Sequence, residues 1–223
     1  MSIKLIAVDM DGTFLSDAKT YNRPRFLAQY QRMREQNIRF VVASGNQYYQ
    51  LISFYAEIAH QIPFVAENGG WVVSGNVDGF NCQLPVHHFN AVVDHLQTLP
   101  NIEIIACGKR SAYTLNRYND ALKTVAAKYY HRLELVDDFN HLDDTILKFG
   151  LNVPDSLIPE IQPKLHAALG DMVTAVATGY GSIDLIIPGV HKANGLRILQ
   201  RRWGIADPEV VAVGDSGSGV ERL

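Results

Sequence analysis

The chain has 223 residues, of which 47% are hydrophobic and 19% charged, and its formal net charge is −3. This composition is typical of a globular protein with a sizeable buried core. It argues against nucleic-acid and anionic-membrane partners, because no basic cluster supplies the electrostatic field that such partners need. No segment approaches the ~20 apolar residues of a membrane span, and no signal-peptide pattern is present. We therefore expect a cytoplasmic protein, whose two cysteines, Cys82 and Cys107, are buried thiols.

Apolar runs and amphipathic segments alternate along the first third of the chain. Short apolar runs that end in small or polar residues are typical of buried parallel strands, and they occur at 3–8, 38–43 and, much later, 210–213. Apolar side chains at helical spacing predict helices at 24–37 and 47–60. Further strands are predicted at 62–66 and 71–74, with a turn between them. A strand–helix–strand unit of this kind favours a parallel sheet with right-handed crossovers.

The middle of the chain, residues 84–188, carries a second α/β pattern without a catalytic motif. Its elements are helices predicted at 89–98, 119–129 and 159–169, and strands predicted at 103–107, 146–151, 172–177 and 182–187. A helix at 192–203 then leads to the strand at 210–213. The sequence therefore predicts two domains: a discontinuous core of residues 1–83 and 189–223, and an inserted α/β domain of residues 84–188.

Two aspartates, Asp9 and Asp11, follow the first predicted strand directly, and Gly12 comes next. Taken alone, these residues are explained about equally well by an Asp-Gly turn that merely ends a strand and by a functional pair of carboxylates. In open α/β folds, however, ligands bind at the carboxyl ends of the strands. We therefore expect the two carboxylates to lie at a ligand-binding edge of the sheet.

Three further polar sites occur where a predicted strand ends or a predicted helix begins. Ser44 and Gly45 end the second strand, Lys192 begins the helix after the insertion, and Asp215 follows the last strand. Individually, Ser44 fits a helix N-cap and Lys192 fits a solvated surface lysine, although a lysine at that end opposes the helix dipole. Four such sites in one chain favour a common function for them.

The segments Asp9-Met10-Asp11-Gly12-Thr13, Ser44-Gly45, Lys192 and Gly214-Asp215, with a large insertion before the lysine, resemble the motifs of the haloacid dehalogenase superfamily. The insertion resembles the cap of its Cof-type phosphatases. Several stretches also resemble a bacterial broad-specificity sugar phosphatase of that group: 9–21, 40–55, 64–69, 106–113 and 183–195. The resemblance implies a Rossmann-like three-layer α/β core with a parallel sheet, an inserted α/β cap that sets substrate specificity, and magnesium-dependent hydrolysis of small sugar phosphates.

The resemblance also assigns roles. Asp9 would be the nucleophile that forms an aspartyl-phosphate, and Asp11 would be the general acid and base. Asp9, the backbone carbonyl of Asp11, and Asp215 would bind Mg2+, a cation that prefers oxygen ligands. The phosphate-binding residues would be Ser44, the amide of Gly45, Lys192 and Ser218, which surround the phosphoryl oxygens with donors and positive charge.

The last motif differs from the family pattern Gly-Asp-x-x-Asn-Asp, because Ser218 and Gly219 stand where Asn and Asp are usual. The chain also ends at Leu223, earlier than we expect for this family, so the strand at 210–213 is expected to be a sheet edge. A catalytically impaired sugar-phosphate-binding or scaffold protein is therefore an alternative, and a phosphotransfer enzyme is a third possibility. We expect a monomer or weak homo-oligomer, and the sequence does not indicate which sugar is bound.

Overall fold

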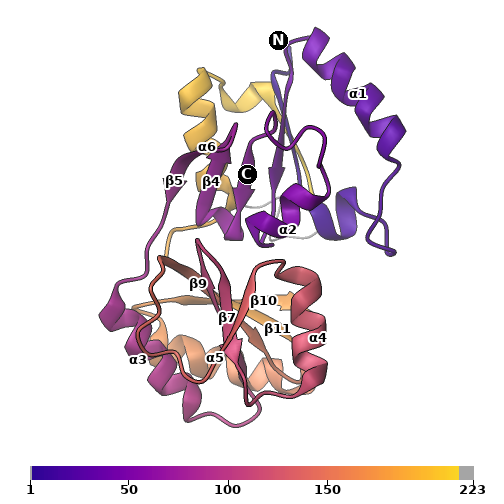
Figure 1. The fold of residues 1–223 in the computed structure, drawn as a ribbon. Coiled ribbons are helices and arrows are strands. Elements are labelled where there is room, and N and C mark those ends of the chain that lie inside the picture. Colours follow the sequence, from indigo (N-terminus) through magenta and orange to yellow (C-terminus); the bar gives the residue numbers. More distant parts are fainter. Residues whose placement is uncertain (1, 216–223) are drawn as a thin grey trace. The chain divides into compact units, whose positions relative to one another are not determined.

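The structure is a computed structural model that describes residues 2–215 (Figure 1). Its contacts divide the chain into two compact units. The first, called the core unit, comprises Met1–Phe80 and His191–Leu223, and the second, called the inserted unit, comprises Asn81–Val190. The assignment of these units as a catalytic core and a specificity cap stays a prediction.

The core unit is built on one sheet with the strand order β12-β1-β2-β3-β4-β5. Strands β12, β1, β2 and β3 are parallel, and β4 runs antiparallel to β3. The strands are β1 (Leu5–Val8), β2 (Arg39–Ala43), β3 (Phe64–Ala66), β4 (Trp71–Ser74), β5 (Val77–Asn81) and β12 (Val210–Val213). The helices are α1 (Arg23–Glu35), α2 (Tyr48–Ser53) and α6 (Lys192–Trp203).

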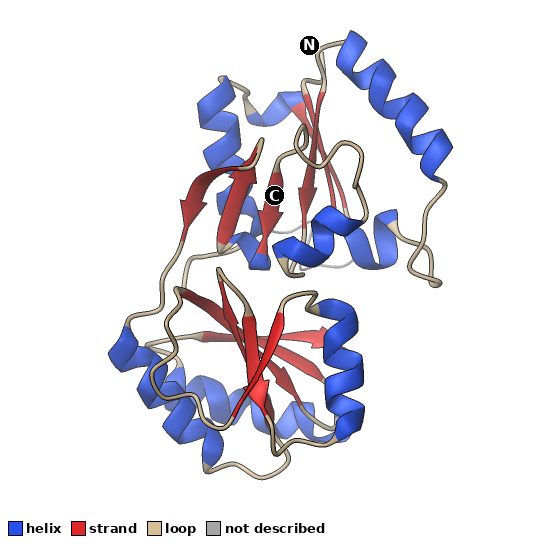
Figure 2. Cartoon of the chain, in the orientation of Figure 1, coloured by secondary structure: helices blue, strands red, loops and turns tan. Residues whose placement is uncertain are grey.

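Side-chain alternation along β2 explains why helices cover both faces of this sheet (Figure 2). Val41 and Ala43 point to one face, where they share a buried cluster with Leu196 and Leu199 of α6. Phe40 points to the other face, and its ring centroid lies 4.9 Å from that of Phe26 on α1. Successive strand residues point to opposite faces, so the continuous apolar run of β2 fits a strand buried on both sides. The predicted three-layer α/β core is confirmed.

The helix predicted at 47–60 is wrong in length, because α2 ends at Ser53. The Ser53 hydroxyl donates a hydrogen bond of 2.5 Å to the carbonyl of Gln50, which is the acceptor that the Phe54 amide would need to continue the helix. The Phe54 amide instead donates to Leu51, and the chain continues through tight turns. The spacing of apolar residues, from which the longer helix was predicted, does not indicate such competition by a side chain.

Two strands of the core unit also differ from expectation. β3 begins at Phe64 rather than at 62, since Pro63 has no N–H to donate to a ladder. β12 is an edge strand, as expected from the sequence, but it is not buried: Val211 is 38% and Val213 45% exposed. Within residues 2–215, β12 has a neighbouring strand on one side only.

The inserted unit is a second six-stranded sheet with the order β10-β11-β9-β6-β7-β8. Its pairs are antiparallel except for the parallel pair β7 and β8. The strands are β6 (Glu103–Gly108), β7 (Ala112–Leu115), β8 (Leu133–Val136), β9 (Ile146–Asn152), β10 (Thr174–Gly179) and β11 (Ser182–Ile186). The helices are α3 (Val86–Gln97), α4 (Asp120–Tyr129) and α5 (Ile158–Leu169).

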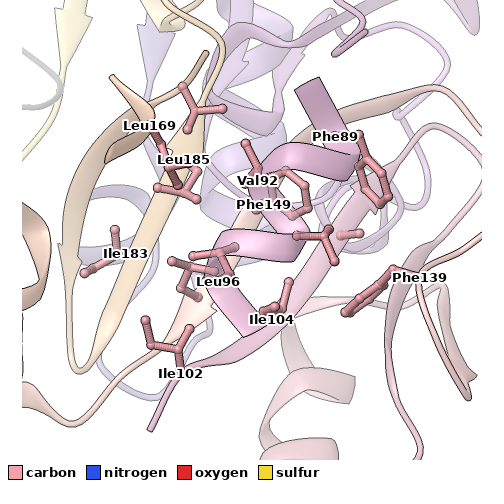
Figure 3. Packing of buried hydrophobic residues seen from close by; sticks show 14 of the residues in the cluster. Phe89, Val92, Leu96, Ile102, Ile104, Phe139, Phe149, Leu169, Ile183 and Leu185 are labelled. Atoms are coloured by element: carbon pink, nitrogen blue, oxygen red, sulfur yellow. The ribbon is translucent and has the colours of Figure 1, made fainter. Parts of the chain in front are cut away.

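The main hydrophobic core of the inserted unit lies between its sheet and the helices α3 and α5. Figure 3 shows Phe89, Val92 and Leu96 of α3 beside Phe149 and Ile104 of the sheet. The rings of Phe89 and Phe149 stack with centroids 5.3 Å apart. α4 covers the opposite face through Ala126, so this unit has its own three-layer packing.

Strands β7 and β8 are absent from the sequence prediction. β7 is only four residues long and places Tyr113 and Thr114 between Ala112 and Leu115, so it shows neither alternation nor an apolar run. β8 is a half-exposed edge strand. Cys82 and Cys107 are buried thiols, as predicted. Among the residues that the structure describes, no helix is both long and apolar enough to cross a membrane.

A close approach of α6 to the sheet yields a test of this packing. An added Cβ at Gly195 would lie 2.4 Å from Cγ1 of the fully buried Val65. Gly195→Ala should therefore lower the free energy of unfolding by about 1–3 kcal/mol through overpacking, although alanine is the better helix former. Urea unfolding measures the effect, with Arg197→Ala on the exposed face of α6 as the control. Equal stability of Gly195→Ala and the wild type would contradict this packing.

Candidate active site

The site begins where β1 ends, because three neighbouring strands end at the same level of the sheet. Val8 is paired with Val42 of β2 and with Val213 of β12. The amide of Asp9 continues the ladder by donating to the carbonyl of Val213, at 3.0 Å. The residues that follow these strands therefore lie at one edge of the core unit, as the sequence predicted.

A wide turn, Met10–Phe14, carries the chain away from Asp9, and its backbone is not helical at Asp11 and Gly12. The Leu15 amide closes this turn on the Met10 carbonyl at 2.9 Å. Aromatic packing anchors it: the Phe14 ring centroid lies 4.9 to 5.9 Å from those of Tyr21, Phe26, Phe40 and Tyr55. This aromatic cluster fixes the turn that presents Asp9 and Asp11.

Tyr55 is the buried centre of the aromatic cluster. Its side chain is fully buried, and its hydroxyl donates to the sulfur of Met10 at 3.2 Å. Burial raises the pKa of the Tyr55 hydroxyl well above its ordinary value. The hydroxyl therefore keeps its proton and remains a donor beneath the turn.

The Asp9 carboxylate is held at both oxygens. Oδ1 accepts the Met10 amide at 2.8 Å, and Oδ2 accepts Lys192 Nζ at 2.8 Å. The side chains of Asp9 and Lys192 are 14% and 12% exposed. Lys192 is the first residue of α6, where its charge opposes the helix dipole. Its ion pair with Asp9 gives a physical reason for a lysine at this position.

The Asp11 carboxylate is also held at both oxygens, by two residues that were not predicted as site residues. Lys19 Nζ donates to Oδ1 at 2.7 Å, and Asn46 Nδ2 donates to Oδ2 at 2.8 Å. Asn46 directly follows Ser44 and Gly45, so its proximity to that motif was a usable signal. Lys19 lies eight residues beyond Asp11, inside the stretch 9–21 but outside the motif Asp9–Thr13, and sequence spacing did not single it out.

Ser44 and Gly45 occupy the loop after β2, next to the Asp11 turn. Ser44 is 2% exposed, and its Oγ accepts the Asn46 amide at 3.1 Å. It is not the N-cap of a helix, because α2 begins at Tyr48 and its cap is Gln47. The turn after β3 packs on this loop, with the Asn68 amide donating to the Ser44 carbonyl at 3.1 Å. Asn68 was not predicted as a site residue.

Asp215 lies over the same turn. An added Cβ at Gly12 would lie 2.1 Å from Asp215 Oδ2, so the carboxylate rests directly against the Gly12 backbone. Gly12 also has φ +74°, a backbone conformation that side chains disfavour. Ser218, the remaining predicted site residue, and its neighbour Gly219 lie outside the described residues.

The predicted metal ligands offer the right donor chemistry for Mg2+. Within residues 2–215, no three His, Cys, Asp or Glu side chains gather closely enough to hold a metal ion by themselves. The predicted set is different, because it combines two carboxylates, Asp9 and Asp215, with the backbone carbonyl of Asp11. The Asp215 carboxylate contacts Gly12, which is the residue directly after Asp11 in the chain. All donors are oxygens, which fits a hard divalent cation.

Comparisons with known proteins find similar phosphatases. The chain is 68% identical over 223 residues to 5-amino-6-(5-phospho-D-ribitylamino)uracil phosphatase YbjI of Escherichia coli strain K12, covering 100% of this chain and 82% of that protein. It is 25% identical over 236 residues to YitU of Bacillus subtilis strain 168, which bears the same enzyme name, covering 98% and 82%.

Solved structures show the same fold. The crystal structure of SMU.1108c from Streptococcus mutans UA159 superposes with a TM-score of 0.93 at 30% identity, over 100% of this chain and 84% of that one. The sugar phosphatase BT4131, described as a member of HAD subclass IIB, superposes with a TM-score of 0.80 at 15% identity, over 96% and 82%. A family model for haloacid dehalogenase-like hydrolases matches residues 6–220. The chain therefore belongs to the haloacid dehalogenase-like hydrolase family, among its phosphatases.

Proposed function

We propose that this phosphatase hydrolyses phosphate monoesters of sugars or sugar alcohols, with Mg2+, through an aspartyl-phosphate on Asp9. The names of two relatives support the substrate class, because both are phosphatases of a compound that carries phosphate on a ribityl chain. A ribityl phosphate and a pentose phosphate present the same chemical group, a phosphorylated primary alcohol on a short polyhydroxy chain. Both therefore belong to the substrate class that we propose.

The observation that carries the proposal is the ion pair between Lys192 and Asp9. A nucleophilic carboxylate needs a phosphate dianion close to it, although the two anions repel each other. Lys192 Nζ, 2.8 Å from Asp9 Oδ2, supplies a positive charge at that point. In a site where both side chains are less than 15% exposed, such a charge acts more strongly than it would in water.

The reaction would take two steps. First, an Asp9 oxygen attacks phosphorus while Asp11 gives a proton to the leaving ester oxygen, so the P–O ester bond breaks and the alcohol departs. Second, Asp11 takes a proton from water, the water oxygen attacks phosphorus, and the bond from phosphorus to Asp9 breaks. Asp11 thereby returns to its protonated form, and inorganic phosphate leaves.

The remaining residues would bind and orient the phosphate. Ser44, the Gly45 amide and Lys192 would donate to the phosphoryl oxygens, with Ser218 as a fourth donor. Asp9, the Asp11 carbonyl and Asp215 would hold Mg2+, which when bound supplies further positive charge to those oxygens. The contact of Asp215 with Gly12 supports this role.

A substitution of the nucleophile tests the proposal. Asp9→Asn keeps the size of the side chain but removes the attacking oxygen anion, so kcat should fall by at least about 1,000-fold. Phosphate release from D-ribose 5-phosphate and p-nitrophenyl phosphate is measured with Mg2+ and with excess chelator. Asp171→Asn, at an exposed turn of the inserted unit, is the control. Substantial activity in Asp9→Asn, or full activity in chelator, would contradict the proposal.

The contact of Gly12 with Asp215 provides a second test. Gly12→Ala should displace the Asp215 carboxylate and lower kcat/KM by on the order of 100-fold, the typical cost of a misplaced catalytic group. Gly75→Ala is a matched control, because Gly75 has φ +60° but an added Cβ would meet no atom closer than 3.6 Å. Both variants carry backbone strain of roughly 1–2 kcal/mol. Equal activities of the two variants would contradict a catalytic role for Asp215.

The altered fourth motif provides a third test, based on the sequence pattern. Restoring the usual residues with Ser218→Asn and Gly219→Asp should raise kcat/KM if these positions limit phosphate and metal binding. An increase of several-fold, with a lower Mg2+ concentration for half-maximal activity, is the expected result in a magnesium titration. An unchanged titration curve would show that Ser218 and Gly219 do not impair the enzyme.

A further inference from the structure

We propose that Lys19 is a positioning residue that, together with Asn46, fixes the Asp11 carboxylate in the orientation needed for proton transfer. The inference rests on the proposed role of Asp11 as the general acid and base. It concerns a residue that the motifs of the sequence do not include.

The contacts define a two-sided clamp on Asp11. Lys19 Nζ lies 2.7 Å from Oδ1, and Asn46 Nδ2 lies 2.8 Å from Oδ2. The terminal torsion of an aspartate is broad, so a carboxylate held at one oxygen can still rotate. Donors on both oxygens, which come from different loops, fix the plane of the carboxylate.

The backbone at Lys19 indicates that this contact is not incidental. Lys19 has φ +58°, in the left-handed region that a lysine rarely adopts. A tight hairpin imposes it: the Ser16 amide donates to the Thr20 carbonyl at 2.9 Å, and the Lys19 amide donates to the Ser16 carbonyl at 2.8 Å. Asparagine and glycine adopt this conformation at lower cost, so the turn alone does not favour lysine.

Stability alone does not explain the lysine either. The side chains of Lys19 and Asp11 are 48% and 35% exposed, and ion pairs this exposed to solvent contribute little to stability. The left-handed backbone of Lys19 has a larger cost, because the Cβ of a residue in this conformation crowds the backbone. The ion pair therefore does not offset the backbone cost, and the action of the ammonium on Asp11 explains the lysine at this position.

The central experiment uses Lys19→Asn, which suits the left-handed turn but removes the ammonium. General acid catalysis matters most for poor leaving groups. We therefore expect kcat/KM for D-ribose 5-phosphate to fall on the order of 10-fold and kcat/KM for p-nitrophenyl phosphate to change much less. Lys19→Arg should restore most of the activity. Lys164→Gln removes an exposed 2.7 Å ion pair with Glu160 elsewhere and should leave both values unchanged.

A double-mutant cycle shows whether Lys19 acts through Asp11. In an Asp11→Asn background, Lys19→Asn should cause no further loss of ribose 5-phosphate hydrolysis, because interacting residues are non-additive. An additive loss, or an equal loss for both substrates with a raised KM, would show that Lys19 binds the phosphate directly and would overturn the inference. Full activity of Lys19→Asn would also overturn it. A wild-type protein without phosphatase activity would refute the proposed function itself.

Discussion

The ion pair between Asp9 and Lys192 is the contact on which the rest of the candidate site depends. Its partners are 183 positions apart in the chain, and the whole inserted unit lies between them in sequence. The two residues meet because β1 ends at Asp9 and because α6 packs on the same sheet through Leu196 and Leu199. A nearly buried ion pair contributes little net stability, since the desolvation of both charges offsets their attraction. We infer that the pair serves the reaction at the Asp9 carboxylate and not the stability of the fold.

Other contacts at this edge of the core-unit sheet hold the residues around the Asp9–Lys192 pair in place. The aromatic cluster under Phe14 holds the turn that follows Asp9. Asp215 rests on Gly12 of that turn, and Asn46 reaches Asp11 from the loop after β2. The turn after β3 contacts both the Ser44 loop and α6. Five segments of the chain thus present acids, amides and a lysine at one edge of one sheet: the turn after Asp9, the loops after β2 and β3, the start of α6, and Asp215 after β12.

The sequence predicted the fold class and many of the residues at this edge of the sheet, because the carboxyl ends of strands can be recognised in a sequence. An apolar run that stops at an acid or a hydroxyl marks both the strand and the residue at its carboxyl end, as at Asp9 and Ser44. The positions of Lys19 and Asn68 were not predictable in this way. Their contacts depend on left-handed backbone turns, with φ +58° and +57°, which carry no apolar periodicity. The early end of α2 likewise depends on one hydroxyl, that of Ser53.

In the proposed reaction Asp9 itself carries the phosphoryl group, and isolation of that intermediate is the sharpest test of this role. Enzyme mixed with substrate and Mg2+ is quenched within milliseconds and treated with borohydride, which reduces an aspartyl-phosphate to homoserine. Peptide mass spectrometry then locates the modified residue. We expect homoserine at position 9, with none in enzyme quenched without substrate. Modification at another residue, or none while substrate is being turned over, would contradict it.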